Sequence, residues 1–290
     1  MRVLDRVPEF SAALDAERRA GRRVGLVPTM GALHDGHASL MRQAAAECDV
    51  VAVTVFVNPL QFGAGEDLDA YPRTLDADVG LAEQAGASIV LAPTVAEMYG
   101  EGTATTVSLA DGMTRVLEGA SRPGHFDGVS TVVAKLFAMA GACHAYFGEK
   151  DFQQLAVVRR MARDLSFPVT VVGCPTVRAE DGLALSSRNA YLGADERAAA
   201  PVLHRALRAG AAAIDAGERH PAVVEAVMAA ELATETLVTQ DYAAVVDAAT
   251  LGRPDPLTGD LRLLVAARLP SARLIDNLGV TVSGTHRKDA

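Results

Sequence analysis

Short apolar runs alternate with amphipathic stretches over the first 175 residues of the chain. The runs at residues 24–27, 50–57, 88–91, 145–147 and 169–172 are almost continuously apolar, which is typical of buried parallel strands. Apolar positions at helical spacing predict helices over residues 38–47, 76–85, 129–140 and 152–165. Strands that alternate with helices predict an α/β domain over residues 1–175, with a parallel sheet covered on both faces.

The pattern changes after Pro175. Alanine-rich helices are predicted over residues 194–216 and 221–235, and strand-like segments follow at residues 242–246, 261–267 and 273–275. Helices followed by a run of strands predict a second, smaller α+β domain over residues 176–290.

Composition limits the classes of function. The chain has 290 residues and a formal net charge of −9, which argues against a general nucleic-acid or anionic-membrane surface. Cys48, Cys143 and Cys174 lie far apart in apolar surroundings, so we expect buried free thiols in a reducing compartment. The N-terminus lacks a signal-peptide pattern and no apolar run reaches membrane-spanning length, which favours a cytoplasmic protein.

The segment with the most chemical content is residues 28–37, Pro-Thr-Met-Gly-Ala-Leu-His-Asp-Gly-His. It follows an apolar strand and opens a helix, so His34 and His37 lie on nearly the same face of the first helical turn. Unpaired N–H groups at a helix N-terminus favour an anion, and imidazoles can donate to phosphate oxygens. The segment predicts a site where the α-phosphate of a nucleotide is attacked, although a solvated helix face or a partial metal site would also fit two histidines.

A second polar segment, residues 146–155, also follows a short strand and opens a helix. Lys150 at this turn can follow phosphate charge, and Asp151 can cap its helix or accept from a ribose hydroxyl. Gln153 and Gln154 begin an otherwise apolar helix, which indicates polar recognition of an enclosed group. A solvated surface would explain Lys150 equally well.

The third segment lies in the predicted second domain. Ser186, Ser187 and Arg188 resemble a phosphate-gripping loop, in which small side chains let backbone N–H groups approach and arginine supplies a planar fork. An ordinary helix cap is the alternative for the two serines.

Together these segments resemble the pantothenate synthetase family, pantoate–β-alanine ligases of the His-x-Gly-His nucleotidyltransferase superfamily. The match includes residues 28–37, 56–62, 148–151, 153–154 and 186–189, and it extends to residues 122–129 and to Asp276-Asn277. It runs in order along the chain and leaves only the tail after residue 282 unmatched. Leu185 stands where the family often has methionine, a swap that roughly conserves volume.

The resemblance implies a Rossmann-like first domain and an amide ligase that joins pantoate to β-alanine. ATP would be consumed through a pantoyl adenylate, AMP and pyrophosphate would be released, and Mg²⁺ would accompany ATP. The resemblance also implies a homodimer. His34, His37 and Lys150 would be catalytic, Gln61, Gln154 and Asn58 would bind pantoate, and Gln61 would bind β-alanine. ATP would contact Met30, Gly31, Ala32, Leu33, His34, Asp35, Gly36, His37, Gly148, Glu149, Lys150, Asp151, Val177, Leu185, Ser186, Ser187 and Arg188.

Several alternatives stay open. Another nucleotidyltransferase with the same histidine turn would place a phosphate or amine where the Gln61 and Gln154 amides stand. A non-catalytic nucleotide-binding regulator would tolerate the loss of a charged phosphate contact, and none is missing. Two interpretations fit four apolar residues: they line the site around the gem-dimethyl group of pantoate, or they simply belong to the core. These residues are Met30, Phe56, Val132 and Val133. No metal ligands are assigned, and Asp76 and Asp78 are not proposed as such.

Overall fold

The computed structural model describes residues 1–110 and 112–283, and it divides into two compact units, Met1–Val177 and Arg178–Ala290. Residues 284–290 of the predicted second domain lie outside the described residues. Each unit has its own sheet and its own core, and each is described separately.

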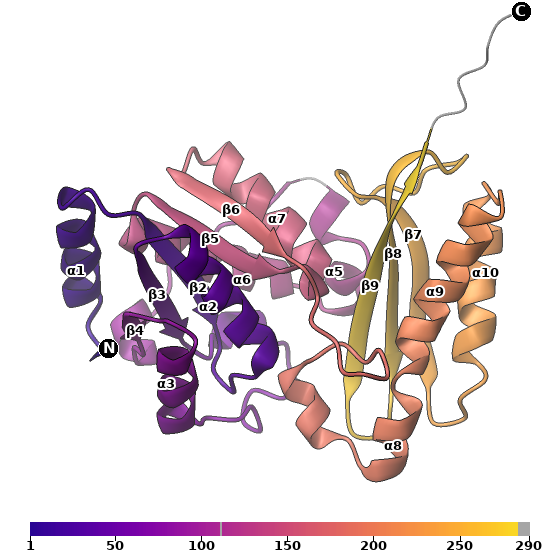
Figure 1. Cartoon of the computed structure of the whole chain (residues 1–290), viewed down its shortest axis with the longest axis horizontal. Helices are drawn as coiled ribbons and strands as arrows, with labels where there is room; N and C mark the ends of the chain where they lie inside the picture. Colours follow the sequence, from indigo (N-terminus) through magenta and orange to yellow (C-terminus); the bar gives the residue numbers. More distant parts are fainter. Residues whose placement is uncertain (111, 284–290) are drawn as a thin grey trace, which may run out of the picture. The chain divides into compact units, whose positions relative to one another are not determined.

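The first unit is built on a six-stranded sheet (Figure 1). Its strands are β1 (Arg2–Leu4), β2 (Val24–Thr29), β3 (Val50–Val55), β4 (Ile89–Leu91), β5 (Cys143–Gly148) and β6 (Val169–Cys174). They are ordered β1-β4-β3-β2-β5-β6, and every pair is parallel. Strand order reverses direction at the β2–β5 pair, which is where open α/β sheets bind ligands at the carboxyl ends of their strands.

Helices cover both faces of this sheet. One face carries α2 (Asp35–Glu47) and α3 (Leu75–Gln84), and the other carries α1 (Val7–Arg19), α6 (His125–Ala140) and α7 (Phe152–Asp164). Because both faces are covered, inner strands such as β2 and β3 are buried nearly throughout, as their continuous apolar sequence requires. The shorter elements are α4 (Val95–Tyr99), α5 (Glu118–Ser121), η1 (Pro59–Gln61), η2 (Gly112–Thr114) and η3 (Glu149–Asp151).

Helix α6 lies directly against the η1 turn that follows β3. A Cβ added at Gly128 would lie 2.2 Å from the Leu60 carbonyl oxygen and 2.6 Å from the Gln61 nitrogen. Only glycine permits this approach, because any other side chain would force one of the two backbones to move. The η1 turn therefore rests on main chain rather than on a layer of side chains.

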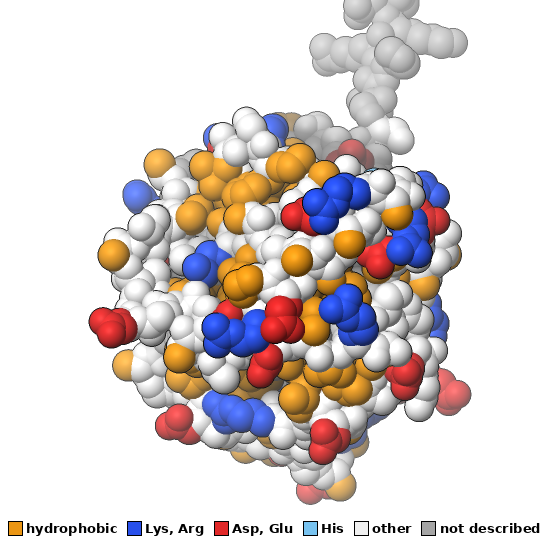
Figure 2. Space-filling model, turned by 90° about the vertical axis from the view of Figure 1, so that its left-hand side faces the viewer, with side chains coloured by type: hydrophobic (Ala, Val, Ile, Leu, Met, Phe, Trp, Pro, Cys, Tyr) orange, Lys and Arg blue, Asp and Glu red, His pale blue; other side chains and the backbone are white. Residues whose placement is uncertain are grey.

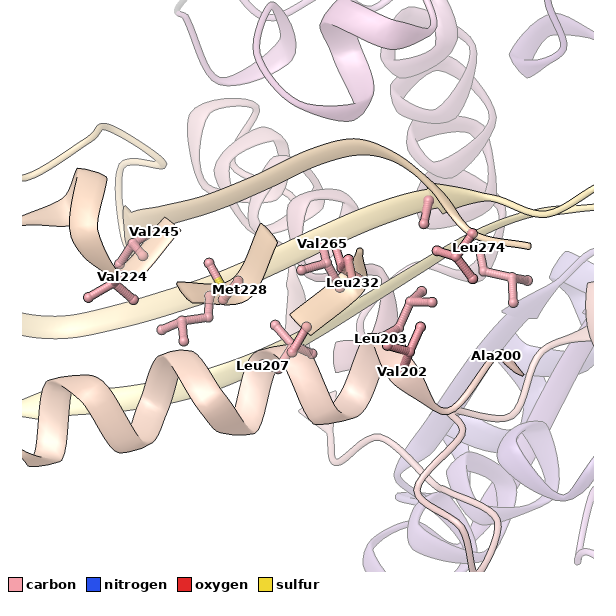
Figure 3. Packing of buried hydrophobic residues seen from close by; sticks show 14 of the residues in the cluster. Ala200, Val202, Leu203, Leu207, Val224, Met228, Leu232, Val245, Val265 and Leu274 are labelled. Carbon is pink, nitrogen blue, oxygen red and sulfur yellow. The ribbon is translucent and has the colours of Figure 1, made fainter. Parts of the chain in front are cut away.

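The second unit packs helices against a three-stranded antiparallel sheet. Its elements are η4 (Ser187–Tyr191), α8 (Ala194–Ala199), α9 (Val202–Asp215), α10 (Pro221–Leu232), β7 (Thr239–Asp247), β8 (Gly259–Arg268) and β9 (Arg273–Val282). Strands are ordered β7-β8-β9, and α9 and α10 contact them. Figure 3 shows Leu203 and Leu207 of α9, Met228 of α10 and Val265 of β8 within one buried apolar cluster.

The predicted fold class, a parallel α/β sheet followed by a smaller α+β unit, is confirmed. Two details differ. The predicted helix over residues 194–216 is broken into α8 and α9, because Pro201 lacks the N–H that a continuous helix would need. The helices α1, α4 and α5 and the short strand β1 were not predicted.

Surface and thiol chemistry agree with the composition. On the face drawn in Figure 2, acidic and basic side chains are interspersed without a broad region of either sign. Cys48, Cys143 and Cys174 are free and buried, as expected. Within residues 1–110 and 112–283, no helix combines the length and apolar character needed to cross a membrane.

Candidate functional site

Three loops that follow β2, β3 and β5 hold most of the predicted residues of the first unit. The loop after β2 carries residues 30–37, the turn after β3 carries Asn58 and Gln61, and η3 after β5 carries Glu149, Lys150 and Asp151. Because β3, β2 and β5 are neighbours in a parallel sheet, their carboxyl ends lie along one edge. The sheet therefore brings chemistry from three distant parts of the sequence to one edge.

A buried carboxylate fixes the loop after β2. Asp78 of α3 is 2% exposed, and its two oxygens accept from the backbone nitrogens of Ala32 at 3.1 Å and Leu33 at 2.8 Å. The Thr74 hydroxyl donates to the same carboxylate at 3.1 Å. These bonds hold Gly31 at φ +84° and Ala32 at φ +50°, a backbone conformation that is costly for alanine. The backbone N–H groups of residues 32 and 33 are therefore already hydrogen-bonded within the protein.

The two histidines cap helix α2 themselves. His34 is the N-cap residue, and its Nδ1 accepts from the Gly36 nitrogen at 3.1 Å. His37 Nδ1 accepts from the His34 nitrogen at 3.3 Å. This differs from the prediction of unpaired N–H groups at the helix start, because the imidazoles satisfy two of them. Since each Nδ1 is an acceptor, the ring proton of each histidine is on Nε2.

Both imidazoles are held in the neutral form. Burial lowers the pKa of His37 to about 3, and His34 and Lys150 add to this effect against the opposing influence of Asp151. Burial followed by Lys150 lowers the pKa of His34, while Asp35 and Asp151 oppose the shift. The ring centroids are 4.2 Å apart, so two charged imidazoles would also repel each other. The pair can therefore donate two Nε2–H groups to an anion without carrying charge.

Lys150 supplies positive charge to the same edge. Its Nζ lies 3.9 Å from the Asp151 carboxylate, and its field acts on both histidines. Asp151 precedes α7 as its N-cap residue, but its side chain makes no capping bond and is 49% exposed. Of the two predicted options for Asp151, helix capping is wrong, which leaves its carboxylate available to a ligand hydroxyl.

Gln61 is held by both its side chain and its main chain. Asn58 Nδ2 donates to Gln61 Oε1 at 3.1 Å, and Gln61 Nε2 approaches Met30 Sδ at 3.0 Å. His125 Nδ1 lies 2.9 Å from the Gln61 carbonyl oxygen, and Arg122 Nη1 lies 3.1 Å from His125 Nε2. Burial, then Arg122, lowers the pKa of His125, so a neutral ring accepts from Arg122 and donates to Gln61.

Glu66 extends this arrangement to the loop over residues 63–67. Arg122 donates to both Glu66 oxygens, at 2.8 and 2.7 Å, and this pairing lowers the pKa of Glu66. The loop is thus tied to Arg122, which also supports Gln61 through His125. Arg122 was part of the family resemblance but had no predicted role.

The two glutamines that begin α7 do different things. Gln153 is 3% exposed, accepts from Glu118 N at 3.0 Å and donates to Met113 O and Val116 O, both at 2.8 Å. Its enclosed partner is therefore the backbone between η2 and α5, which corrects the prediction that the amide pair indicates recognition of an enclosed group. Gln154 is half-buried on the same helical turn.

The apolar candidates near Gln61 are packed into the unit. Phe56, Val132 and Val133 are each at most 6% exposed, whereas Met30 is partly exposed beside the Gln61 amide. Most of α6 is buried, so the helix segment 129–140 forms core within the unit.

In the second unit, a partly buried ion pair holds the turn that leads into Leu185, Ser186, Ser187 and Arg188. Arg178 donates to both oxygens of Asp276, at 2.6 and 2.9 Å, and to the Gly182 carbonyl oxygen at 3.0 Å. Ser186 caps η4 by accepting from the Arg188 nitrogen at 3.3 Å, so the helix-cap alternative describes this serine. Val177 lies at the end of the first unit.

Sequence reasoning missed Asp78 as a support of the histidine loop. A signal was present, since Asp78 precedes the buried Ala82 by four residues and so lies on the inward face of α3. A carboxylate on an inward helical face needs donors. The sequence could not tell that backbone N–H groups of the loop after β2 supply them.

Residues 2–279 match the family model described as pantoate-beta-alanine ligase. The pantothenate synthetase of Dinoroseobacter shibae is 56% identical over 266 residues, which cover 91% of this chain and 93% of that protein. A crystal structure of pantothenate synthetase from Thermus thermophilus superposes with a TM-score of 0.92 at 50% identity, covering 97% of this chain and 100% of that one.

A more distantly related structure is a complex with a nucleotide and an amino acid. Pantoate-beta-alanine ligase from Francisella tularensis, complexed with beta-gamma ATP and beta-alanine, has a TM-score of 0.80 at 30% identity. The match covers 96% of this chain and 97% of that one.

Replacing Asp78 with asparagine tests its support of the loop. An amide offers one acceptor oxygen and turns an NH₂ group toward backbone donors, so we expect the free energy of unfolding to fall by about 1–3 kcal/mol. The KM for ATP should rise in the same variant, because the loop that carries the histidines is held less firmly. Asp76→Asn, at an exposed position of the same helical turn, is the control and should change stability by no more than about 0.5 kcal/mol in denaturant titrations. Equal effects of the two variants would contradict the assigned role.

His37 should make stability depend on pH. Its pKa is about 3 in the folded protein and about 6.5 when unfolded. Below pH 6.5 the unfolded chain therefore binds a proton that the native state refuses, and stability is lost as the pH falls toward 3 at up to about 1.4 kcal/mol per pH unit. NMR titration should show an imidazole that stays neutral down to pH 5. A resonance that titrates near pH 6.5 and disappears in His37→Asn would refute this.

Proposed function

The chain belongs to the pantoate-beta-alanine ligase family, and we propose how its residues share the ATP-dependent condensation of pantoate with β-alanine. The reaction proceeds through pantoyl adenylate. A pantoate carboxylate oxygen attacks the α-phosphorus of ATP and pyrophosphate leaves. The amine of β-alanine then attacks the acyl carbon, AMP leaves with the bonding electrons, and the nitrogen loses a proton to form the amide.

His34, His37 and Lys150 serve the first step in this proposal. The observation that carries it is the neutral imidazole pair beside Lys150 at the edge where strand order reverses. Nε2–H groups donate to the α-phosphate as charge builds on its oxygens, and they need not give up a proton or a solvation shell. Lys150 is the mobile cation that follows charge toward the departing pyrophosphate.

The remaining contacts of the first unit with ATP follow from the same loops. Met30, Gly31, Ala32, Leu33, Asp35 and Gly36 would shape the phosphate side, while Gly148, Glu149 and Asp151 would meet the ribose. The exposed Asp151 carboxylate supports the ribose contact, because it has no capping bond to its own helix.

Pantoate is recognised by amides. Gln61 and Gln154 can pair with its hydroxyl groups and carboxylate, and Asn58 contributes by holding Gln61, which it contacts at 3.1 Å. Gln61 would also receive β-alanine, whose amine must reach the acyl carbon next to pantoate. The half-buried Gln154 and the Gln61 amide beside Met30 support this assignment.

The outer phosphates are assigned to Ser186, Ser187 and Arg188 of the second unit, with Val177 and Leu185 as neighbours of the nucleotide. Mg²⁺ would neutralise pyrophosphate. Within the described parts of the chain, no three His, Cys, Asp or Glu side chains cluster as a metal site. A Mg²⁺ held by phosphate oxygens and water fits that surrounding, because this ion keeps several waters and binds through substrate phosphates. A cytoplasmic homodimer is a further proposal that rests on the family resemblance.

Isotope exchange tests the two-step scheme. Because pantoyl adenylate forms before the amine reacts, pantoate alone should support exchange of labelled pyrophosphate into ATP without β-alanine. Exchange that requires β-alanine, or equal use of CTP, would contradict the scheme.

Two substitutions test the division of labour. Lys150→Ala removes a charge whose interaction strengthens in the transition state, so adenylation in single-turnover assays should fall by about a hundredfold or more. Gln154→Ala leaves the phosphates held but unpairs polar groups of pantoate, so its loss should appear mainly as a higher KM for pantoate. Normal adenylation by Lys150→Ala, or a Gln154→Ala defect confined to ATP, would overturn these roles.

A further inference from the structure

A chain of side-chain hydrogen bonds leads from Tyr99 to Gln61. Tyr99 ends helix α4, and its hydroxyl donates to Asn58 Oδ1 at 2.7 Å across 41 positions of sequence. Asn58 Nδ2 then donates to Gln61 Oε1 at 3.1 Å. Tyr99 and Asn58, from separate elements, thus support the Gln61 amide, which the proposed function assigns to pantoate binding.

The orientation of the Asn58 amide is fully determined. Its oxygen accepts from Tyr99 and from the Leu60 nitrogen at 3.3 Å, and its NH₂ group donates to Gln61 and to the Gly128 carbonyl oxygen at 3.2 Å. Asn58 is 1% exposed, so water does not compete for these groups. Both amide hydrogens and both carbonyl lone pairs are in use, which leaves Asn58 no capacity for a ligand.

This orientation passes on to Gln61. Since Gln61 Oε1 accepts from Asn58, the group that Gln61 turns toward Met30 is its NH₂. A rotation of the Gln61 amide would set two NH₂ groups against each other inside a buried cluster, at the cost of an unsatisfied donor. Gln61 is therefore preset to donate to oxygen atoms, which is what a hydroxy acid offers.

Tyr99 is suited to the outer end of this chain. Its ring lies 6.0 Å from the Phe56 ring, and Lys135 Nζ lies 5.7 Å from its centroid, so packing and charge locate the phenol. Burial raises the pKa of Tyr99 to about 12, so the hydroxyl keeps its proton and remains a donor throughout the physiological range.

We propose that Tyr99 is a positioning residue for pantoate recognition, acting through Asn58 to fix the direction in which Gln61 donates. The inference rests on the proposed role of Gln61. Loss of the Tyr99 hydroxyl removes the shortest of the four hydrogen bonds that orient the Asn58 amide. The orientation of Gln61 should therefore be held less firmly, while the loop after β2 is untouched.

Tyr99→Phe tests this with little change in volume. The KM for pantoate should rise by about threefold to tenfold, as expected for one lost hydrogen bond, whereas kcat and the KM for ATP should stay near their original values. Tyr146→Phe is the matched control. It removes a buried hydroxyl that bonds to Glu47 at 2.9 Å and Cys48 at 3.3 Å, so it should lower the Tm without changing the KM for pantoate.

A double variant distinguishes an effect passed from Tyr99 through Asn58 to Gln61, here called the relay, from a general loss of packing around Tyr99. Gln61→Ala should by itself raise the KM for pantoate by about tenfold or more, and adding Tyr99→Phe should then have no further effect. An equal effect of Tyr99→Phe in both backgrounds, a change confined to ATP, or no change at all would overturn the inference and leave the role of Gln61 intact. An unchanged KM for pantoate in Gln61→Ala would refute the proposed role of Gln61 and the relay with it.

Discussion

The grip of the Asp78 carboxylate on the loop after β2 is the interaction on which the histidine site depends. A buried charge is tolerated only where donors surround it, and here two backbone N–H groups and a threonine hydroxyl do so. In return, the carboxylate holds Gly31 and Ala32 in a left-handed turn whose conformation is costly for alanine. That turn sets the point at which α2 begins, and hence where His34 and His37 lie.

The edge of the sheet that we propose as the ATP site presents two neutral donors beside the charge of Lys150. Burial and a nearby lysine keep both histidines uncharged. The arrangement suits a reaction in which ATP must enter and pyrophosphate must leave, because fixed donors stabilise transient charge without binding the product as strongly as a row of buried cations would.

The sequence was informative wherever the physics is local or periodic. Apolar runs predicted the inner strands, and the segments that carry His34 and Lys150 were each predicted to follow a strand. In a parallel sheet this places them at one edge. What the sequence could not supply was the identity of long-range partners. The sequence gives no reason to treat Gln153 and Gln154 differently. In the structure, Gln153 binds the backbone of residues 113–118, whereas Gln154 is half-buried on the same turn. Asp78 and Tyr99 were overlooked for the same reason, since their partners are 45 and 41 positions away.

The contact of α6 with the η1 turn has a consequence for how this protein can change. Gly128 leaves no room for a Cβ beside the Leu60 carbonyl. The η1 turn that carries Gln61 therefore lies on the main chain of α6, with no side chain between them at this point. A change in side-chain size at position 128 therefore cannot move Gln61 by small amounts. If Gln61 binds the acid as proposed, new acid specificities would have to arise at other proposed contacts, such as Gln154, while the η1 turn is inherited unchanged.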